Sequence, residues 1–154
     1  MIAESHQREG SRKARKLASK ALENSLKAYK ALPEKDQADK KAKYSASRAR
    51  FLEAEYLLKD FLAYKIIPYP QRKLVKTLTK KAELQQACEK AYLEVLGYKA
   101  YQVSAGAFFR IADIYNTFAQ TLTGLEPPRE LEDNPEALDM YQIFIEEKVL
   151  PLEE

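Results

Sequence analysis

The sequence contains few of the residues that catalysis and metal binding require. Its 154 residues include one histidine, His6, and one cysteine, Cys88, with four glycines and no tryptophan. Because the one histidine lies in an N-terminus that we expect to be frayed, neither a histidine-based metal site nor a histidine-based triad is expected. A single cysteine excludes an intramolecular disulfide. No glycine-rich loop precedes a helix, which excludes the usual phosphate-binding loops. We therefore expect a protein that is not an enzyme and that binds no cofactor and no metal.

Long apolar runs are also missing. No run approaches the roughly 18 residues that cross a bilayer, and the N-terminal stretch MIAESHQREG lacks the apolar core of a signal peptide. The chain as given is thus expected to be soluble. Its last residues, VLPLEE, carry no helix stop signal, which indicates a piece of a longer protein.

The residues that are abundant favour helix. Ala, Leu, Lys and Glu lose little side-chain freedom in a helix. Apolar residues recur at helical spacing in five segments that prolines and glycines separate, namely 4–32, 36–64, 71–98, 104–124 and 135 to the end. We predict one all-α domain over residues 1–154, with about five long antiparallel helices. Helix starts near 36, 71 and 103 recur roughly every 33 to 35 residues, which is typical of repeat proteins, although ordinary bundles also contain helices of equal length.

Particular residues mark the predicted helix ends. Pro33 ends the first helix, and Gly97 is expected to end the third in a left-handed conformation. Gly124 is expected to cap the fourth helix. Asn134 followed by Pro135 predicts the N-cap and first turn of the last one.

The apolar spacing also predicts which residues form the core. The first helix has a stripe made mostly of alanine, which contributes little transfer energy, so we expect it to be the weakest layer: Ala14, Ala18, Ala21, Leu22, Ser25, Ala28, Tyr29 and Leu32. The predicted core of the third helix is Leu74, Leu78, Leu84, Cys88, Ala91, Tyr92 and Val95. Since no basic group or second cysteine near Cys88 indicates a reactive thiolate, we predict a buried, unreactive thiol.

The helix at 104–124 is the most regular in the chain. Counted at about 100° per residue from Phe108, one apolar arc of about 160° contains Ala107, Ile111, Ala112, Ile114, Tyr115, Phe118, Ala119 and Leu122. Phe109 falls outside it, among Asp113, Asn116 and Gln120. An aromatic ring there either contacts a protein partner or packs against a flanking helix, and the sequence leaves both alternatives open.

Charge is distributed unevenly along the chain. Residues 1–50 carry 14 Lys or Arg against 6 Asp or Glu, whereas residues 101–154 carry 3 against 11. Such polarity is found in solvated helical faces, in proteins that join head to tail with adjoining repeats, and in proteins that bind nucleic acid or an anionic surface. Residues 12–50 would form the binding region in the last case.

One motif resembles a known repeat family. In FFRIADIY, residues 108–115, the spacing Phe-x-x-Ile-Ala-x-x-Tyr resembles the first-helix signature of a tetratricopeptide repeat, Trp-x-x-Leu-Gly-x-x-Tyr. More widely, residues 91–154 resemble tetratricopeptide-repeat proteins of the bacterial cell envelope, including those associated with gliding motility. The pieces that carry this resemblance are AYLEVLGYK, AFFRIADIYNTFAQTL, LEPPREL and MYQIFIEEKVLPLEE.

The resemblance implies a right-handed helical solenoid that binds proteins on its concave face. It places four positions in the core between helices: Phe108, Ile111, Ala112 and Tyr115. It places five candidate partner-binding residues on the concave surface: Gly106, Phe109, Asp113, Asn116 and Thr117. It also implies a location in the bacterial envelope, in the periplasm, with other envelope components or flanking repeats as partners.

Three hypotheses of function follow. The leading one is a non-enzymatic protein-interaction scaffold that binds its partner around Phe109. The second is a basic helical module that binds nucleic acid or an anionic surface through residues 12–50. The third is a bundle that serves only a structural or oligomerising role.

Overall fold

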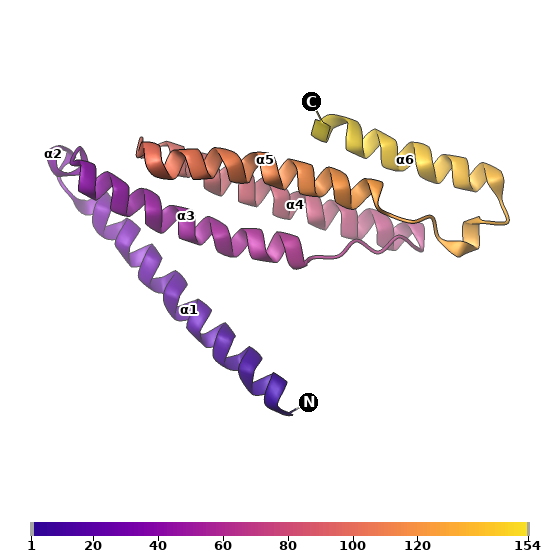
Figure 1. The fold of residues 1–154 in the computed structure, drawn as a ribbon. Coiled ribbons are helices and arrows are strands. Elements are labelled where there is room, and N and C mark those ends of the chain that lie inside the picture. Colours follow the sequence, from indigo (N-terminus) through magenta and orange to yellow (C-terminus); the bar gives the residue numbers. More distant parts are fainter. Residues whose placement is uncertain (1, 154) are drawn as a thin grey trace. The chain divides into compact units, whose positions relative to one another are not determined.

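The computed structural model describes the backbone of residues 2–153 and the side chains of residues 13–149. His6 therefore lies outside the residues whose side chains are described. The described chain is helical and contains no strand, which confirms the all-α prediction (Figure 1). In chain order the elements are α1 (Ile2–Ala31), α2 (Glu34–Gln37), α3 (Lys40–Ala63), α4 (Gln71–Leu96), α5 (Tyr101–Thr123), the 3₁₀ turn η1 (Arg129–Leu131) and α6 (Pro135–Glu153).

Local capping explains where several helices begin. The Asn134 Oδ1 accepts a hydrogen bond of 3.2 Å from the backbone N–H of Ala137, so the predicted N-cap of α6 is confirmed. The single helix predicted over 36–64 is wrong, because α2 and α3 are separate helices. The Asp39 carboxylate accepts hydrogen bonds from the N–H groups of Lys41 and Ala42 at 2.9 and 3.0 Å and so caps α3. These bonds lower the pKa of Asp39.

The turn between α4 and α5 differs from the prediction. Helix α4 ends at Leu96, just before Gly97, but Gly97 does not adopt a left-handed conformation. Instead Lys99 has a φ of 56°. Its N–H donates to the carbonyl of Leu96 at 3.0 Å, so the left-handed residue lies two positions later than the sequence indicates.

The chain divides into two compact units. The first contains Met1–Glu55 and Ala91–Ala107, and the second contains Tyr56–Lys90 and Phe108–Glu154. Helices α3, α4 and α5 each contribute residues to both. The single domain over residues 1–154 stays a prediction.

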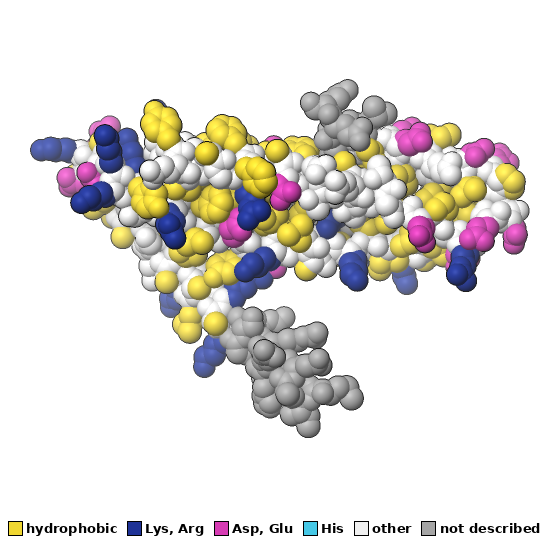
Figure 2. Space-filling view, viewed as in Figure 1, with side chains coloured by type: hydrophobic (Ala, Val, Ile, Leu, Met, Phe, Trp, Pro, Cys, Tyr) yellow, Lys and Arg dark blue, Asp and Glu magenta, His cyan; other side chains and the backbone are white. Residues whose placement is uncertain are grey.

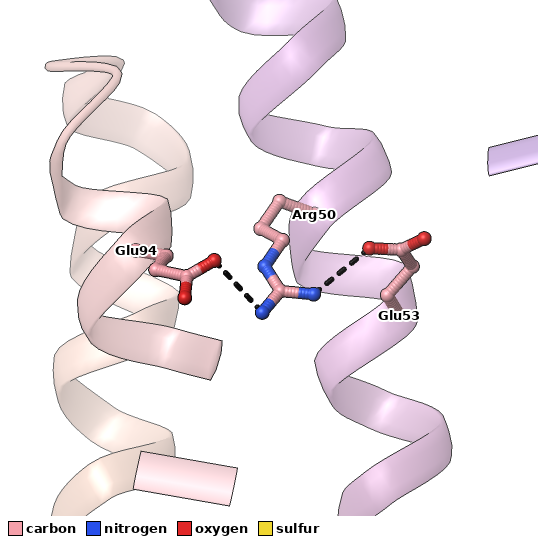
Figure 3. Close-up of polar contacts among 3 residues, drawn as sticks. All are labelled: Arg50, Glu53 and Glu94. Carbon is pink, nitrogen blue, oxygen red and sulfur yellow. Dashed lines mark hydrogen bonds and ion pairs between the residues drawn. The ribbon is translucent and has the colours of Figure 1, made fainter. Parts of the chain in front are cut away.

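Unit 1 is held together by small residues, ring contacts and one ion-pair network. Ala46, Ser47 and Ala54 are fully buried on α3. Arg50 bridges α3 and α4, because its Nη1 lies 2.9 Å from the Glu53 carboxylate and its Nη2 lies 2.8 Å from the Glu94 carboxylate (Figure 3). The guanidinium group satisfies two carboxylates at once, which aligns the two helices.

Helix α1 is the most thinly packed layer in unit 1. Between residues 13 and 31 no side chain is fully buried. Its half-buried side chains are Arg15, Ala18, Ser19, Leu22, Leu26 and Tyr29. The predicted stripe is therefore wrong at its exposed members, which are Ala14, Ala21, Ser25, Ala28 and Leu32. Alanine is a good helix former on any face, so its spacing did not locate the contact.

Unit 2 has the larger apolar core. Phe61 of α3 and Phe118 of α5 meet edge to face with ring centroids 6.1 Å apart. On α4 the buried positions recur every seven residues, at Leu74, Lys81 and Cys88. Val95, in unit 1, continues the same spacing and is also buried. The prediction for α4 is confirmed at Leu74, Leu78, Cys88, Ala91, Tyr92 and Val95, whereas Leu84 is half-buried.

Candidate functional site

The part of α5 that belongs to unit 2 exposes two adjacent phenylalanines. Phe108 is 61% exposed and Phe109 is 67% exposed, and Ala112 and Asn116 are exposed on the same side. At about 100° per residue these four side chains span an arc of about 100°. Figure 2 shows apolar side chains along α5. We call Phe108, Phe109, Ala112 and Asn116 the outer face of α5.

The exposure of Phe108 and Ala112 corrects the predicted core of this helix. The resemblance places both between helices, yet the buried residues of unit 2 on α5 are Ile114, Phe118, Ala119 and Leu122. Ile111 and Tyr115 are half-buried. All four buried residues belong to the arc predicted from the helical wheel, so that arc keeps its direction, and the errors are the exposed Ala112 and, from the resemblance, Phe108.

Tyr115 stands at the edge of the core, where Gln85 and Glu89 of α4 face its hydroxyl group. Burial and the hydrogen bond with Glu89 raise the pKa of Tyr115, while the hydrogen bond with Gln85 lowers it. On the wheel Phe108 lies only about 20° from the buried Ala119, yet it is exposed. A helical wheel cannot separate buried from exposed apolar residues, since much of a protein surface is apolar.

Four of the five candidate residues lie together. Phe109 and Asn116 are exposed, and Asp113 and Thr117 are half-buried next to them on α5. Gly106 belongs to unit 1 and is half-buried. A Cβ at Gly106 would lie 3.4 Å from Cε2 of Phe51, an ordinary van der Waals contact, so Gly106 packs next to a ring of α3.

The polar residues beside the outer face interact mainly along their own helix. The carboxylate of Asp113 lies 3.7 Å from Nη1 of Arg110, and Gln120 donates a hydrogen bond of 3.4 Å to Asn116. The Thr117 carbonyl accepts a hydrogen bond of 2.7 Å from the Thr121 hydroxyl. The ion pair of Asp113 and the hydrogen bond of Asn116 are both long, so these two side chains can exchange them for hydrogen bonds to a partner.

A buried lysine forms a site that sequence reasoning missed. Lys81 is 2% exposed, and its ammonium group donates to the backbone carbonyls of Phe61 and, at 2.9 Å, Tyr64. It also lies 4.2 Å from the centroid of the Phe61 ring. These carbonyls are at the C-terminal end of α3, where a helix presents partial negative charge. Lys81 therefore caps α3 from α4.

The environment of Cys88 combines opposing charges. Lys81 lowers the pKa of the thiol, contrary to the expectation that no basic group lies near it. Burial and the nearby Asp60 act more strongly and raise the pKa to about 11. The thiol is thus buried and stays protonated near neutral pH, which confirms the predicted burial.

One signal in the sequence points to Lys81. Positions 74, 81, 88 and 95 are spaced seven residues apart, and three of them are apolar: Leu74, Cys88 and Val95. The fourth is Lys81, so the spacing alone predicts that this position faces the core. A lysine on such a stripe is ordinarily assigned to solvent because charged residues are rarely fully buried. Buried charges need partners. Here the partners are backbone carbonyls, which every residue has, so the residue types along the chain do not reveal them.

Shallow cavities lie in each unit. In unit 1, a cavity of about 330 Å³ is lined by Tyr44, Arg48, Phe51, Leu52, Gln102, Val103 and Gly106. In unit 2, a mainly apolar cavity of about 340 Å³ adjoins the N-terminal half of α6. Within the described part of the chain, no group of His, Cys, Asp and Glu could hold a metal ion, and no helix is both long and apolar enough to cross a membrane.

Comparisons with known proteins identify no relative for this arrangement. No protein-family model matches the chain, and neither the curated proteins nor the solved structures contain a match.

Proposed function

We propose that this chain is a non-enzymatic protein-interaction module that binds a protein partner on the outer face of α5. The observation that supports this function is the exposure of two adjacent rings, Phe108 at 61% and Phe109 at 67%. Aromatic side chains bury 150–250 Å² each when they are covered, and they dominate the binding energy of many interfaces. Two such rings on one helix face are suited to a partner that covers them.

The surroundings of the rings indicate the chemistry of the partner. Asp113 and Asn116 border the rings, so a partner needs an apolar pocket flanked by hydrogen-bond donors. A helix or loop with aliphatic side chains between basic or amide groups meets both needs.

The resemblance of residues 91–154 supports a more specific version of this proposal. In that version the chain is part of a tetratricopeptide-like right-handed solenoid in the bacterial envelope, with partners among envelope components. The motif FFRIADIY carries that resemblance. Its Phe108 and Ala112 contact solvent rather than the core, so the outer face is larger than the resemblance alone implies.

The experiment compares partner recovery by three variants. Phe108→Ala and Phe109→Ala each remove one ring from the outer face, whereas Leu93→Ala removes an exposed side chain of α4 that is 49% exposed. Tagged variants are incubated with extract from the source cells, and bound proteins are quantified against wild type. We expect one protein that Leu93→Ala retains and that both phenylalanine variants lose at least tenfold. Equal recovery by all three variants would refute the proposal.

The dependence of binding on salt concentration distinguishes the second hypothesis, in which residues 12–50 bind nucleic acid or an anionic surface. Lys13, Lys16, Lys20, Lys27 and Lys30 are all exposed on α1, which is the observation in favour of a basic binding module. Nucleic-acid affinity that depends on six to ten phosphate contacts falls by about 10³ to 10⁵ between 50 and 200 mM salt. Binding centred on Phe109 loses little over that range. If instead no partner is recovered, the structural hypothesis is favoured.

A further inference from the structure

Helix α6 has two exposed apolar residues, Met140 and Ile143, which we call its exposed stripe; they are 67% and 55% exposed. Tyr141, Ile145 and Val149 are buried on another side. At about 100° per residue Ile143 lies roughly opposite Tyr141 and Ile145, whereas Met140 lies about 100° from Tyr141 and also lines the 340 Å³ cavity of unit 2.

The exposed stripe of α6 is bordered by acidic residues. Glu136, Asp139, Glu146 and Glu147 are all exposed. Figure 2 shows acidic side chains gathered around α6. Lys148 lies on another side of the helix, where its ammonium group is 5.4 Å from the centroid of the Phe144 ring. Along the helix axis the stripe therefore has apolar residues in the middle and an acidic residue at each end, Glu136 and Glu147. Its length is about 17 Å.

Unit 1 contains a groove with the complementary properties. The 330 Å³ cavity described above lies between α3 and α5. Tyr44, Arg48 and Leu52 form one face of α3, and Tyr44 and Leu52 are 37% and 42% exposed. Val103 and the side-chain-free Gly106 form the wall on α5. The groove is thus apolar, with room for aliphatic side chains.

The charge around this groove is positive. Arg48 is exposed and donates a hydrogen bond of 3.2 Å to the Tyr44 hydroxyl. Arg48 is the charged residue in the lining, and Lys40 and Lys41 are exposed at the start of the same helix, beside the exposed Asp39. Over the residues of unit 1 the sequence has 15 Lys and Arg against 9 Asp and Glu, whereas unit 2 has 11 against 14. The chain therefore presents a basic groove on one unit and an acidic helix on the other.

We infer that the acidic outer stripe of α6 docks into the α3–α5 groove of a second copy of this chain. Met140 and Ile143 fill the apolar groove, and Glu136 and Glu147 lie near Arg48 and the lysines of α3. The contact joins two different surfaces, the groove of unit 1 and helix α6 of unit 2. A helix of this length covers a small area, so the association is weak and transient.

Charge complementarity decides in favour of a second copy as the occupant. Both halves of the contact are on one chain, and their charges are opposite. Nucleic acid would satisfy the positive charge around Arg48 but would leave Leu52, Val103 and the α6 stripe uncovered. This inference does not depend on the outer face of α5, because none of the residues involved belongs to it.

The test uses two variants that each lose one surface. Leu52→Arg blocks the groove and Met140→Arg blocks α6, and both residues are exposed, so the fold is retained. Circular dichroism confirms the fold, and Leu93→Ala serves as the exposed control. Sedimentation velocity at about 100 µM and low salt measures the mass of each protein.

The expected result is specific to a contact between two different surfaces, the α3–α5 groove of one copy and the helix α6 of another. Wild type and Leu93→Ala form species larger than a monomer, and 0.5 M salt weakens this association at least tenfold. Each arginine variant alone is monomeric, but a mixture of the two forms a one-to-one dimer through the one intact groove and the one intact helix. A monomeric wild type, a monomeric mixture, or association that either variant leaves unchanged would overturn the inference. The inference would also be overturned if the wild type were monomeric and bound nucleic acid, and if the Leu52→Arg variant bound nucleic acid more tightly than the wild type.

Discussion

Replacing Lys81 with methionine tests the buried cap on α3 most informatively. Methionine keeps the apolar stem but removes the ammonium group that donates to the carbonyls of Phe61 and Tyr64. The Phe61 carbonyl still accepts a bond of 3.3 Å from the Tyr64 N–H, so the Tyr64 carbonyl loses most. Leaving a buried carbonyl without a donor costs roughly 1–3 kcal/mol.

The desolvation of the charge opposes this loss. Burial lowers the pKa of Lys81 because it penalises the charged form, and methionine removes that cost. Helix α3 also loses its favourable cation at the C-terminal end, an interaction of about 1 kcal/mol. With the Tyr64 carbonyl left without this donor and the helix-end interaction lost, we expect a net destabilisation of about 2 kcal/mol. For a chain of this size that lowers the melting temperature by about 4–8 °C.

Lys80 provides a matched control on the neighbouring position. Its side chain is 53% exposed and pairs with Glu83 at 2.8 Å on the same helix. Lys80→Met should therefore change the urea midpoint little, while Lys81→Met lowers it clearly. Equal stability of the Lys81→Met variant and wild type in urea unfolding would refute the role assigned to this lysine.

The pH dependence of the same pair of proteins gives an independent check. Because burial lowers the pKa of Lys81 below its ordinary value of 10.5, the unfolded chain binds more protons between the folded pKa and 10.5. The contribution of Lys81 to stability therefore rises as the pH increases through that interval, and Lys81→Met lacks this rise. Urea unfolding of both proteins between pH 7 and 10.5 measures the difference.

Two further predictions concern residues whose burial the structure assigns. Phe118 is 3% exposed and Phe108 is 61% exposed. In urea unfolding, Phe118→Ala should therefore cost about 3–5 kcal/mol, whereas Phe108→Ala should cost less than about 0.5 kcal/mol. Similar losses for the two variants would contradict the assignment of Phe118 to the core and of Phe108 to the surface. The thiol of Cys88 has a pKa raised from 9.0 to about 11, so its thiolate fraction at pH 8 is about 100-fold lower than that of an ordinary thiol. A disulfide reagent should therefore modify Cys88 at pH 8 only after urea unfolds the chain, and fast modification of the folded protein would contradict its burial.

The sequence predicts the helices well where local chemistry determines them. Asn134 and Pro135 define the start of α6 through capping and a fixed φ angle, both of which are local properties. The spacing of Leu74, Cys88 and Val95 also locates the buried side of α4, because burial repeats with the helical period.

The features that the sequence does not predict depend on neighbours from other parts of the chain. Lys81 is buried because backbone carbonyls at the C-terminal end of α3 accept hydrogen bonds from its ammonium group, and every residue has such a carbonyl. Phe108 is exposed although the wheel places it beside the buried Ala119, because no wheel of α5 alone shows where along the helix its neighbours cover it. For the candidate site, the sequence distinguished Phe109, Asp113 and Asn116 from the core, but it assigned the adjacent Phe108 to the wrong side.

Site-specific photocrosslinking tests the proposed function most directly. A photoreactive phenylalanine analogue replaces Phe109 in one protein and Leu93 in another, and each is irradiated in source-cell extract at 200 mM salt. We expect one protein adduct from position 109 that is absent from position 93 and that Phe108→Ala strongly reduces. No adduct from position 109, or the same adduct from both positions, would contradict the claim that the outer face of α5 binds a protein partner.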